Sequence, residues 1–279
     1  MSTWPQFDKA EGEIVRNTLL TNKVNYLNGL HGRKFEIEFS KYIGVKYSIA
    51  VSNGTLAIEL ALLSLKLSKK DEVIVPSKTY VATASAVVNI GAIPKFADID
   101  MNSQNITLET IKKTYSKKTK VIICVHLGGY PCEIDKIKKF CNKNKIFLIE
   151  DCSQAHGAFY KGKSVGSFGN ISTWSFCQDK IITTGGEGGM ISTNSKKLRD
   201  KIWSLKDHGK SYKIFSKKSK KNGFKWMHNS FGTNARLTEM QSAIGRYQLK
   251  KLNNWVKKRR KNSKYLENIF KQYPNQFSI

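Results

Sequence analysis

A lysine followed by a glycine-rich turn is the feature of this sequence most suggestive of chemistry. Lys180 comes four residues after the apolar run Thr173–Phe176, and four glycines follow between Gly185 and Gly189. A neutral lysine amine can form a Schiff base with an aldehyde cofactor, and glycines permit the close backbone approach that a bound cofactor needs. The alternative interpretation is an ordinary surface lysine in a loop.

A carboxylate, Asp151, follows shortly after another apolar run, Ile146–Ile149. A carboxylate at the end of a buried strand needs a cationic partner. A protonated pyridine nitrogen would be such a partner, because an aspartate beside it keeps the ring an electron sink. The same residue could instead cap a helix or form an ion pair in the core.

A third group of candidate residues, Ser52–Thr55, precedes the apolar segment Leu56–Leu65. Free backbone N–H groups and a hydroxyl at a helix N-terminus bind phosphate. A simple helix cap would have much the same sequence, so both interpretations stay open.

The elements that position these groups alternate along the chain, which indicates an α/β fold with a largely parallel sheet. Leu56–Leu65 is apolar on nearly all sides, and Asp135–Asn142 alternates apolar residues and lysine, as expected of two crossover helices. Ligands of such sheets bind outside the carboxyl ends of strands. The predicted strands are Ser48–Val51, Glu72–Val75, Lys95–Ile99, Val121–Val125, Ile146–Ile149, Thr173–Phe176 and Gly189–Ser192.

The pattern changes after Arg236 to one long amphipathic segment. Thr238 and Gln241 predict a capping box at its start, and the apolar stripe continues to about Ile269. We therefore divide the chain into a large domain at residues 1–235 and a helical segment at residues 236–279.

The charge of the chain is strongly positive, with 48 Lys and Arg against 21 Asp and Glu, a net charge of +27. Nucleic acid or a membrane surface would be the usual partner of such a chain. The excess is nearly all lysine and is scattered, whereas nucleic-acid-binding surfaces favour arginine with aromatics, so we expect neither partner. The densest stretch, Lys210–Lys225, is predicted to be a mobile solvated loop. A positive surface would also attract a substrate that carries a diphosphate.

The cysteines and the N-terminus suggest a cellular location. Five cysteines with no CxxC pair predict neither a disulfide framework nor a metal site. The start of the chain lacks the basic-then-apolar layout of a signal peptide, and no apolar run approaches the roughly 18 residues that a membrane span needs. We expect a cytoplasmic protein.

These segments together resemble the DegT/DnrJ/StrS family of sugar-nucleotide aminotransferases, which are fold-type I enzymes dependent on pyridoxal 5'-phosphate (PLP). The resemblance covers almost the whole chain. The matching segments are Phe35-Glu36, Tyr47–Thr55, Pro76–Ala82, Gly91–Asp100, Val125–Pro131, Glu150–Gly157, Ser175–Gly189, His208-Gly209 and Gly232–Gly245.

The resemblance implies a three-layer α/β large domain with a mostly parallel seven-stranded sheet, followed by the first helix of a small domain. It implies transfer of an amino group from glutamate to a keto-sugar nucleotide, in the synthesis of lipopolysaccharide, another surface polysaccharide or another glycoconjugate. Lys180 would be the Schiff-base lysine and Asp151 the partner of the pyridine nitrogen. Gln154 would donate a hydrogen bond to the phenolic oxygen of the cofactor, and Tyr80 would stack on its ring.

The resemblance also implies how the cofactor's phosphate is held. Gly54, Thr55 and Ser175 would bind it within one subunit. Asn234 would reach it from the neighbouring subunit, so the active site would require a homodimer.

The sequence departs from the family pattern in two respects. Cys177 stands where many relatives carry histidine or an aromatic, which we expect to alter substrate contacts. Family members also usually continue further, adding a small domain that closes over the substrate. We therefore expect a truncated chain that binds PLP but transaminates sugar nucleotides poorly. His156 lies within a family motif, and its role could be direct or structural.

Three alternative functions have features that distinguish them. Relatives that deoxygenate sugars with the same cofactor carry histidine at the lysine position, which argues against that reaction for a chain with Lys180. A PLP-binding protein without turnover, regulatory or degenerate, would follow from a missing domain. A basic nucleic-acid-binding protein would bind random duplex in a salt-dependent way and would show no chromophore.

Overall fold

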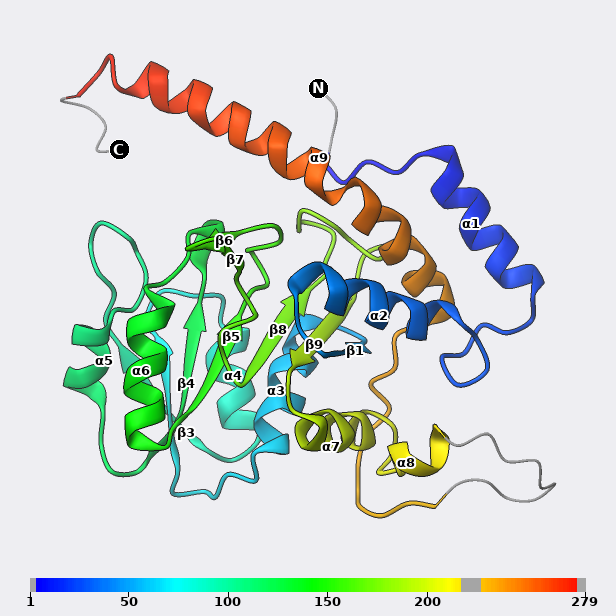
Figure 1. The fold of residues 1–279 in the computed structure, drawn as a ribbon, viewed down its shortest axis with the longest axis horizontal. Coiled ribbons are helices and arrows are strands. Elements are labelled where there is room, and N and C mark those ends of the chain that lie inside the picture. The colour runs from blue at the N-terminus through cyan, green and yellow to red at the C-terminus, as the bar shows by residue number, and fades with distance from the viewer. Residues whose placement is uncertain (1–3, 217–226, 275–279) are drawn as a thin grey trace.

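A seven-stranded sheet forms the centre of the computed structural model, which describes residues 4–216 and 227–274 (Figure 1). The strand order is β1-β9-β8-β5-β4-β2-β3. The strands are β1 (Tyr47–Val51), β2 (Glu72–Pro76), β3 (Ile93–Ala97), β4 (Thr119–Val125), β5 (Phe147–Asp151), β8 (Ile171–Ser175) and β9 (Gly189–Thr193), and a separate hairpin joins β6 (Phe159–Tyr160) to β7 (Lys163–Ser164).

The sheet is mostly parallel, as predicted, and β9 alone runs against its neighbours β1 and β8. The seven predicted runs correspond to its seven strands, although the ends of several differ by one or two residues and β3 is displaced by two residues at both ends. β3 begins at Ile93 rather than Lys95, because its pairing with β2 starts at Ile93 opposite Glu72. Most of β3 is exposed at the edge of the sheet, so its apolar residues were a poor guide to its ends.

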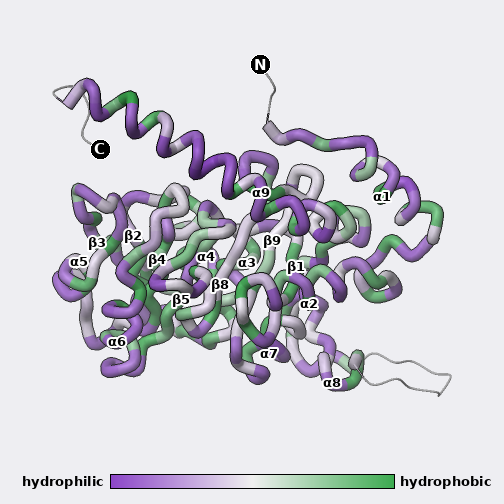
Figure 2. Tube along the Cα trace, turned by 45° about the horizontal axis from the view of Figure 1, so that its top comes forward, coloured by the Kyte–Doolittle hydropathy of each residue, from purple (hydrophilic) through white to green (hydrophobic). Residues whose placement is uncertain are grey.

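Helices cover both faces of the sheet, which gives the predicted three layers (Figure 1). Apolar residues of α3, α4 and α7 pack on one face. Residues of α2 and α9 pack on the other face at one end of the sheet, and residues of α5 and α6 do so at the other end. Figure 2 shows the hydrophobic residues concentrated in this interior. The helices are α1 (Lys9–Leu20), α2 (His31–Ile43), α3 (Gly54–Ser64), α4 (Ala82–Asn89), α5 (Leu108–Thr114), η1 (Leu127–Gly129), α6 (Ile134–Asn144), α7 (Lys196–Lys206), α8 (Tyr212–Phe215) and α9 (Glu239–Phe270).

The long C-terminal helix α9 is present with the predicted start. Thr238 and Gln241 form the capping box. The first half of α9 packs on α1 and α2, and its second half extends away from the body of the molecule (Figure 1). Leu266 in that second half is 49% exposed. None of the helices in the described ranges is long and apolar enough to span a membrane.

The prediction of a solvated loop at Lys210–Lys225 is wrong for its first part. Tyr212–Phe215 forms the short helix α8, and the rings of Tyr212 and Phe215 lie 5.1 and 4.7 Å from that of Trp203. Two aromatics three positions apart face the same side of one helical turn, so they pack on α7 together. Residues 217–225 lie outside the described ranges.

Candidate active site

A pocket of about 570 Å³ opens at the carboxyl ends of β1, β5 and β8. We call it the strand-end pocket. Seven of the eight predicted site residues line it, so the fold brings together positions that are up to 126 residues apart. They are Gly54, Thr55, Tyr80, Asp151, Gln154, Ser175 and Lys180.

The N-terminus of α3 forms one wall and has the shape of a phosphate cradle. Asn53 caps the helix, its side chain accepting a hydrogen bond of 2.9 Å from the N–H of Leu56. Gly54 packs against Ser175 so closely that a Cβ on Gly54 would lie 2.7 Å from the Cβ of Ser175. Only glycine therefore leaves the first N–H groups of α3 and the Ser175 hydroxyl beside one another, an arrangement that suits a phosphate.

Asp151 is buried at the end of β5 and is 5% exposed. One of its oxygens accepts from the N–H of Ser153 at 3.1 Å, and the other from the hydroxyl of Thr83 at 3.3 Å. Burial raises the pKa of Asp151, although these hydrogen bonds and the charge of His126 oppose the increase. No lysine or arginine of the described ranges pairs with this carboxylate, and a protonated ring nitrogen in the pocket would supply the missing cation.

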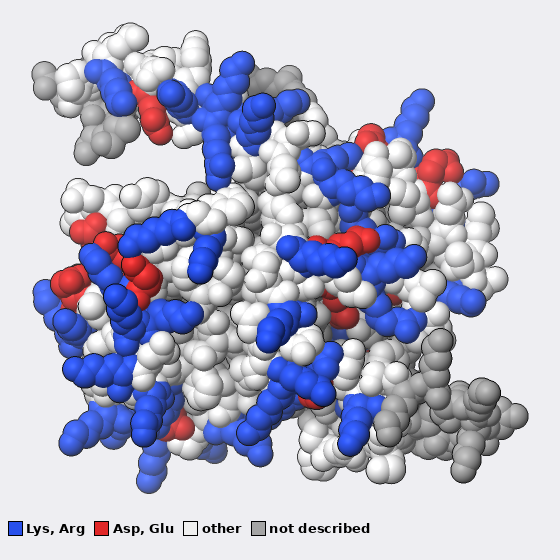
Figure 3. All heavy atoms as spheres, in the orientation of Figure 1, with Lys and Arg blue, Asp and Glu red and all other residues white. Residues whose placement is uncertain are grey.

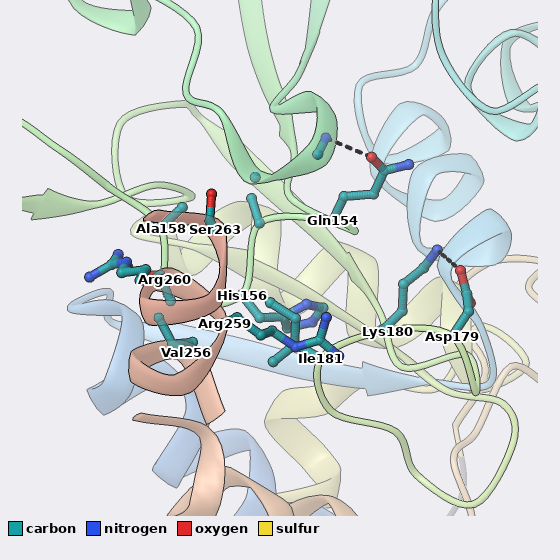
Figure 4. Close-up of a pocket in the computed structure, with 14 residues that line it drawn as sticks. Gln154, His156, Ala158, Asp179, Lys180, Ile181, Val256, Arg259, Arg260 and Ser263 are labelled. Atoms are coloured by element: carbon teal, nitrogen blue, oxygen red, sulfur yellow. Dashed lines mark hydrogen bonds and ion pairs between the residues drawn. The ribbon is translucent and has the colours of Figure 1, made fainter. Parts of the chain in front are cut away.

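Lys180 lies in the loop after β8, and its side chain is 18% exposed. Its Nζ donates a hydrogen bond of 2.9 Å to Asp179, and the side chain extends away from α9 (Figure 4). The backbone of Lys180 is fixed on two sides. Its N–H donates to the carbonyl of Cys177, and its own carbonyl accepts from the indole N–H of Trp4 at 2.9 Å.

Gln154 has its amide oriented by the backbone of η1. The N–H of Gly128 donates to the Gln154 Oε1 at 2.7 Å (Figure 4). Because the oxygen is used in this way, the amide nitrogen remains the group that can donate within the pocket. The donor role of Gln154 toward a cofactor stays a prediction.

The remaining two predicted residues are Tyr80 and Asn234. Within one subunit neither is placed against a bound cofactor. Tyr80 lines the pocket but is 72% exposed. Asn234 is absent from the pocket lining and pairs instead with Asp207 in an isolated antiparallel bridge. Its contact with a phosphate across a dimer stays a prediction.

His156 and Cys177, whose roles the sequence left open, have different surroundings. His156 is 2% exposed, its ring lies 5.5 and 5.6 Å from those of Trp174 and Phe176, and burial lowers its pKa to about 3, with the charge of Lys180 contributing. It is therefore a neutral packing residue. Cys177 lines the strand-end pocket, where its Sγ lies 3.8 Å from Glu187.

A buried polar cluster beside the site was not predicted. His126 bonds Glu150 at 3.1 Å, and the two Glu150 oxygens also accept the N–H groups of Gly166, Phe168 and Gly169. His126, Glu150 and Cys152 bring three possible metal ligands within 4.8 Å. Because the carboxylate is already saturated with hydrogen bonds, we assign the cluster to holding β4, β5 and the 166–169 loop together.

Thr83 and Trp4 were also missed. Their contacts join residues 68 and 176 positions apart in the chain. Neither a threonine in a helix nor a tryptophan near the N-terminus carries a local signal of such a contact.

The chain matches a known protein family. A model of the DegT/DnrJ/EryC1/StrS aminotransferase family matches residues 5–279. GDP-perosamine synthase of Escherichia coli O157:H7 is 40% identical over 248 residues, which are 89% of this chain and 64% of that enzyme. The chain thus spans about two thirds of the length of this relative.

Two solved structures share the fold. The aminotransferase from Psychrobacter cryohalolentis is 49% identical with a TM-score of 0.96, over 99% of this chain and 70% of that one. The GDP-4-keto-6-deoxy-D-mannose-3-dehydratase of Escherichia coli, solved with bound hydrated PLP, is 32% identical with a TM-score of 0.87, over 98% of this chain and 74% of that one. The protein belongs to the DegT/DnrJ/EryC1/StrS aminotransferase family.

Proposed function

We propose that the protein is a PLP-dependent aminotransferase that moves an amino group from glutamate to a keto-sugar nucleotide, in the synthesis of a surface polysaccharide or another glycoconjugate. The observation that carries the proposal is the strand-end pocket, where a lysine amine, a buried carboxylate and a helix N-terminus lie together. Membership of an aminotransferase family and identity to a GDP-perosamine synthase support it.

The residues of the pocket fit the parts of PLP. The N-terminus of α3, with Gly54 and Thr55, and the hydroxyl of Ser175 hold the phosphate. Asp151 pairs with the ring nitrogen, and Gln154 donates to the phenolic oxygen. Bound PLP supplies an aldehyde that reacts with amines and a ring that withdraws electrons from the neighbouring carbon.

Lys180 is the residue that moves protons. Its Nζ accepts the proton that leaves the α-carbon of glutamate, and in the second half-reaction it delivers a proton to the sugar carbon that receives the amino group. A positioned acid–base group of this kind contributes roughly 10²–10⁴-fold in rate. Asp179, 2.9 Å from Nζ, positions the free amine before the cofactor attaches to it.

Lys180 also favours amino transfer over sugar deoxygenation. The two solved structures, an aminotransferase and a dehydratase, have this fold in common. A lysine can both attach the cofactor and transfer the proton to the sugar carbon, which an amino transfer requires.

The complete site is proposed to form in a homodimer. Tyr80 exposes most of its surface at the mouth of the strand-end pocket, and Phe231, three residues before Asn234, is 98% exposed. A second subunit that covers these side chains would place its Asn234 at the phosphate. We propose no nucleic acid or membrane as partner, because lysine and arginine are spread over the face shown in Figure 3 rather than gathered in one stripe.

The proposal includes a cytoplasmic location and a division of the chain. All five cysteines are free and four are buried, which fits a reducing compartment. Residues 1–235 form the cofactor-binding domain, because every residue that lines the strand-end pocket precedes that boundary. Residues 236–279 contain α9, which leads away from this domain (Figure 1).

The test is an assay of the purified 279-residue chain with glutamate, PLP and a panel of keto-sugar nucleotides, in which release of 2-oxoglutarate is followed. We expect release above that of a Lys180→Gln variant prepared in parallel. Equal release of 2-oxoglutarate by the two proteins would contradict the proposal. So would the absence of 2-oxoglutarate when the PLP-loaded chain reacts with glutamate alone in a single turnover.

A further inference from the structure

Thr83, in the first turn of α4, has a hydroxyl group with an unusual pair of partners. The residue is 1% exposed and lines the strand-end pocket. Threonine hydroxyls inside helices commonly bond to the backbone carbonyl four residues earlier, and those of Thr18 and Thr114 do so in this chain, at 2.7 and 3.1 Å. The hydroxyl of Thr83 instead contacts two side chains, those of Asp151 and Thr79. Its position therefore serves these neighbours rather than the helix itself.

The direction of these hydrogen bonds follows from the chemistry of the three groups. Thr83 Oγ1 lies 3.3 Å from Asp151 Oδ2 and 3.0 Å from Thr79 Oγ1. An ionised carboxylate can only accept, and a hydroxyl has a single hydrogen to donate. Thr83 therefore donates to Asp151, and its oxygen is left to accept from the hydroxyl of Thr79. The result is a directed chain in which Thr79 orients Thr83 and Thr83 orients Asp151.

The Asp151 carboxylate is thereby held from two separate segments. Thr83 reaches Oδ2 from α4, and the N–H of Ser153, just after β5, reaches Oδ1 at 3.1 Å. Helix α4 is itself fixed, since Ala86 and Val87 pack in the core. The branched side chain of threonine also has few rotamers, so its hydroxyl keeps its direction. One donor on each oxygen restrains the rotation of the carboxylate.

The restrained carboxylate faces the proposed cofactor site. Thr79, Thr83 and Asp151 all line the strand-end pocket. A group whose orientation is fixed before a ligand binds loses little conformational entropy on pairing with it. Burial raises the pKa of Asp151, and the hydrogen bonds from Ser153 and Thr83 oppose this increase. The hydroxyl of Thr83 thus favours both the direction and the charge of the carboxylate.

We propose that Thr83, oriented by Thr79, is a positioning residue, whose hydroxyl directs the ionised Asp151 carboxylate at the nitrogen of the bound cofactor ring. The proposal rests on the proposed function, in which Asp151 pairs with that nitrogen. The alternative is a purely structural role, in which Thr83 only fills buried space beside Asp151. Valine would fill that space equally well, so the two explanations predict different results for one substitution.

The test compares three substitutions in the PLP-loaded chain. T83V replaces the hydroxyl by a methyl group, and T83S keeps the hydroxyl without the methyl group. T18V, the matched control, makes the same change as T83V at a buried helical threonine that does not line the pocket. Stopped-flow absorbance measures the glutamate half-reaction. NMR of PLP labelled with nitrogen-15 in the ring measures the protonation of the ring nitrogen, and thermal unfolding verifies that each protein is folded.

We expect T83V to slow the glutamate half-reaction on the order of tenfold, the effect of one lost hydrogen bond to a charged group. The nitrogen signal should move toward that of an unprotonated ring, because a carboxylate that loses a donor takes up a proton more readily. T83S should keep the wild-type signal and a rate within about threefold of the wild type, since it keeps the donor. T18V should match the wild type in both measurements.

Three results would overturn the inference. A wild-type rate and nitrogen signal in T83V would show that the hydroxyl has no effect on the site. Equal losses in T83S and T83V would show that packing rather than the donor matters, and equal losses in T18V and T83V would show a general effect on the fold. D151N separates this inference from the proposed function. If D151N slows the half-reaction while T83V does not, only this inference is wrong, whereas a normal rate in D151N would contradict the role of Asp151 itself.

Discussion

Asp151 is the single residue whose surroundings say most about the chemistry. Burial disfavours the charged form of this carboxylate, which accepts hydrogen bonds from Thr83 and Ser153. It pairs with no lysine or arginine in the described chain, so a bound positive charge would stabilise it. We therefore regard it as a functional carboxylate rather than a helix cap or a core ion pair.

We predict that Asp151→Asn lowers the rate of the glutamate half-reaction on the order of 10²-fold or more, because the amide keeps the shape but removes the charge that faces the ring nitrogen. PLP affinity should fall much less. Stopped-flow absorbance with glutamate measures the first quantity, and equilibrium titration with PLP measures the second. A normal single-turnover rate would show that the carboxylate has no electronic role.

His156 gives a prediction about pH. Its pKa is about 3 in the folded chain and near 6.5 when exposed, so the unfolded chain binds the proton more tightly. The free energy of unfolding should then fall by about 1.4 kcal/mol per pH unit as the pH drops from 6.5 toward 3, from this residue alone. Urea unfolding at pH 7.5 and 5 should show this loss in the wild type and a smaller one in His156→Phe, whose ring suits the same aromatic neighbours. Equal losses would mean that His156 is protonated in the fold.

The candidate site residues could be predicted from sequence where a motif is local. Lys180 beside its glycines and Gly54 beside Asn53 are examples, and both lie in the strand-end pocket. The contacts of Trp4 with Lys180 and of Arg259 with Trp4 could not be predicted in this way, because the packing of α9 against the N-terminal segment brings these residues together.

At the scale of elements, Gly157 determines how closely α9 packs against residues 154–158. We predict that Gly157→Ala destabilises the chain by about 2–4 kcal/mol, the sum of a left-handed alanine and an overpacked contact with Val256. Urea unfolding measures this. In Gly157→Ala/Val256→Ala the contact is relieved but the backbone strain is not. A double-mutant cycle should therefore show that the two substitutions together cost less than the sum of the single ones, and simple additivity would contradict the close approach.

The sheet and the two crossover helices were predictable because buried parallel strands are continuously apolar. The hairpin β6–β7 and the helix α8 were not, since two-residue strands and a single helical turn are too short to show a period. β3 was displaced because it is an exposed edge strand. Trp255 on α9 is half-buried because Trp4 packs against it, a contact between distant segments that no local pattern indicates.

At the scale of the whole molecule, the site is proposed to require two subunits. Asn234→Ala should weaken PLP binding by roughly tenfold, the effect of one lost hydrogen bond to a charged group. Asn229→Ala, on the same extended segment, is the control. Sedimentation should show a dimer for all three proteins. A monomer that binds PLP with full affinity would contradict the shared site.

The attachment of the cofactor is the central claim, and borohydride reduction of the PLP-loaded chain followed by peptide mapping tests it most directly. The chain contains many lysines, so the position of the label discriminates sharply. We predict that the protein is yellow and that the added mass lies on Lys180, with none bound irreversibly by Lys180→Ala. A label on any other lysine, or equal labelling of the two proteins, would contradict the assignment.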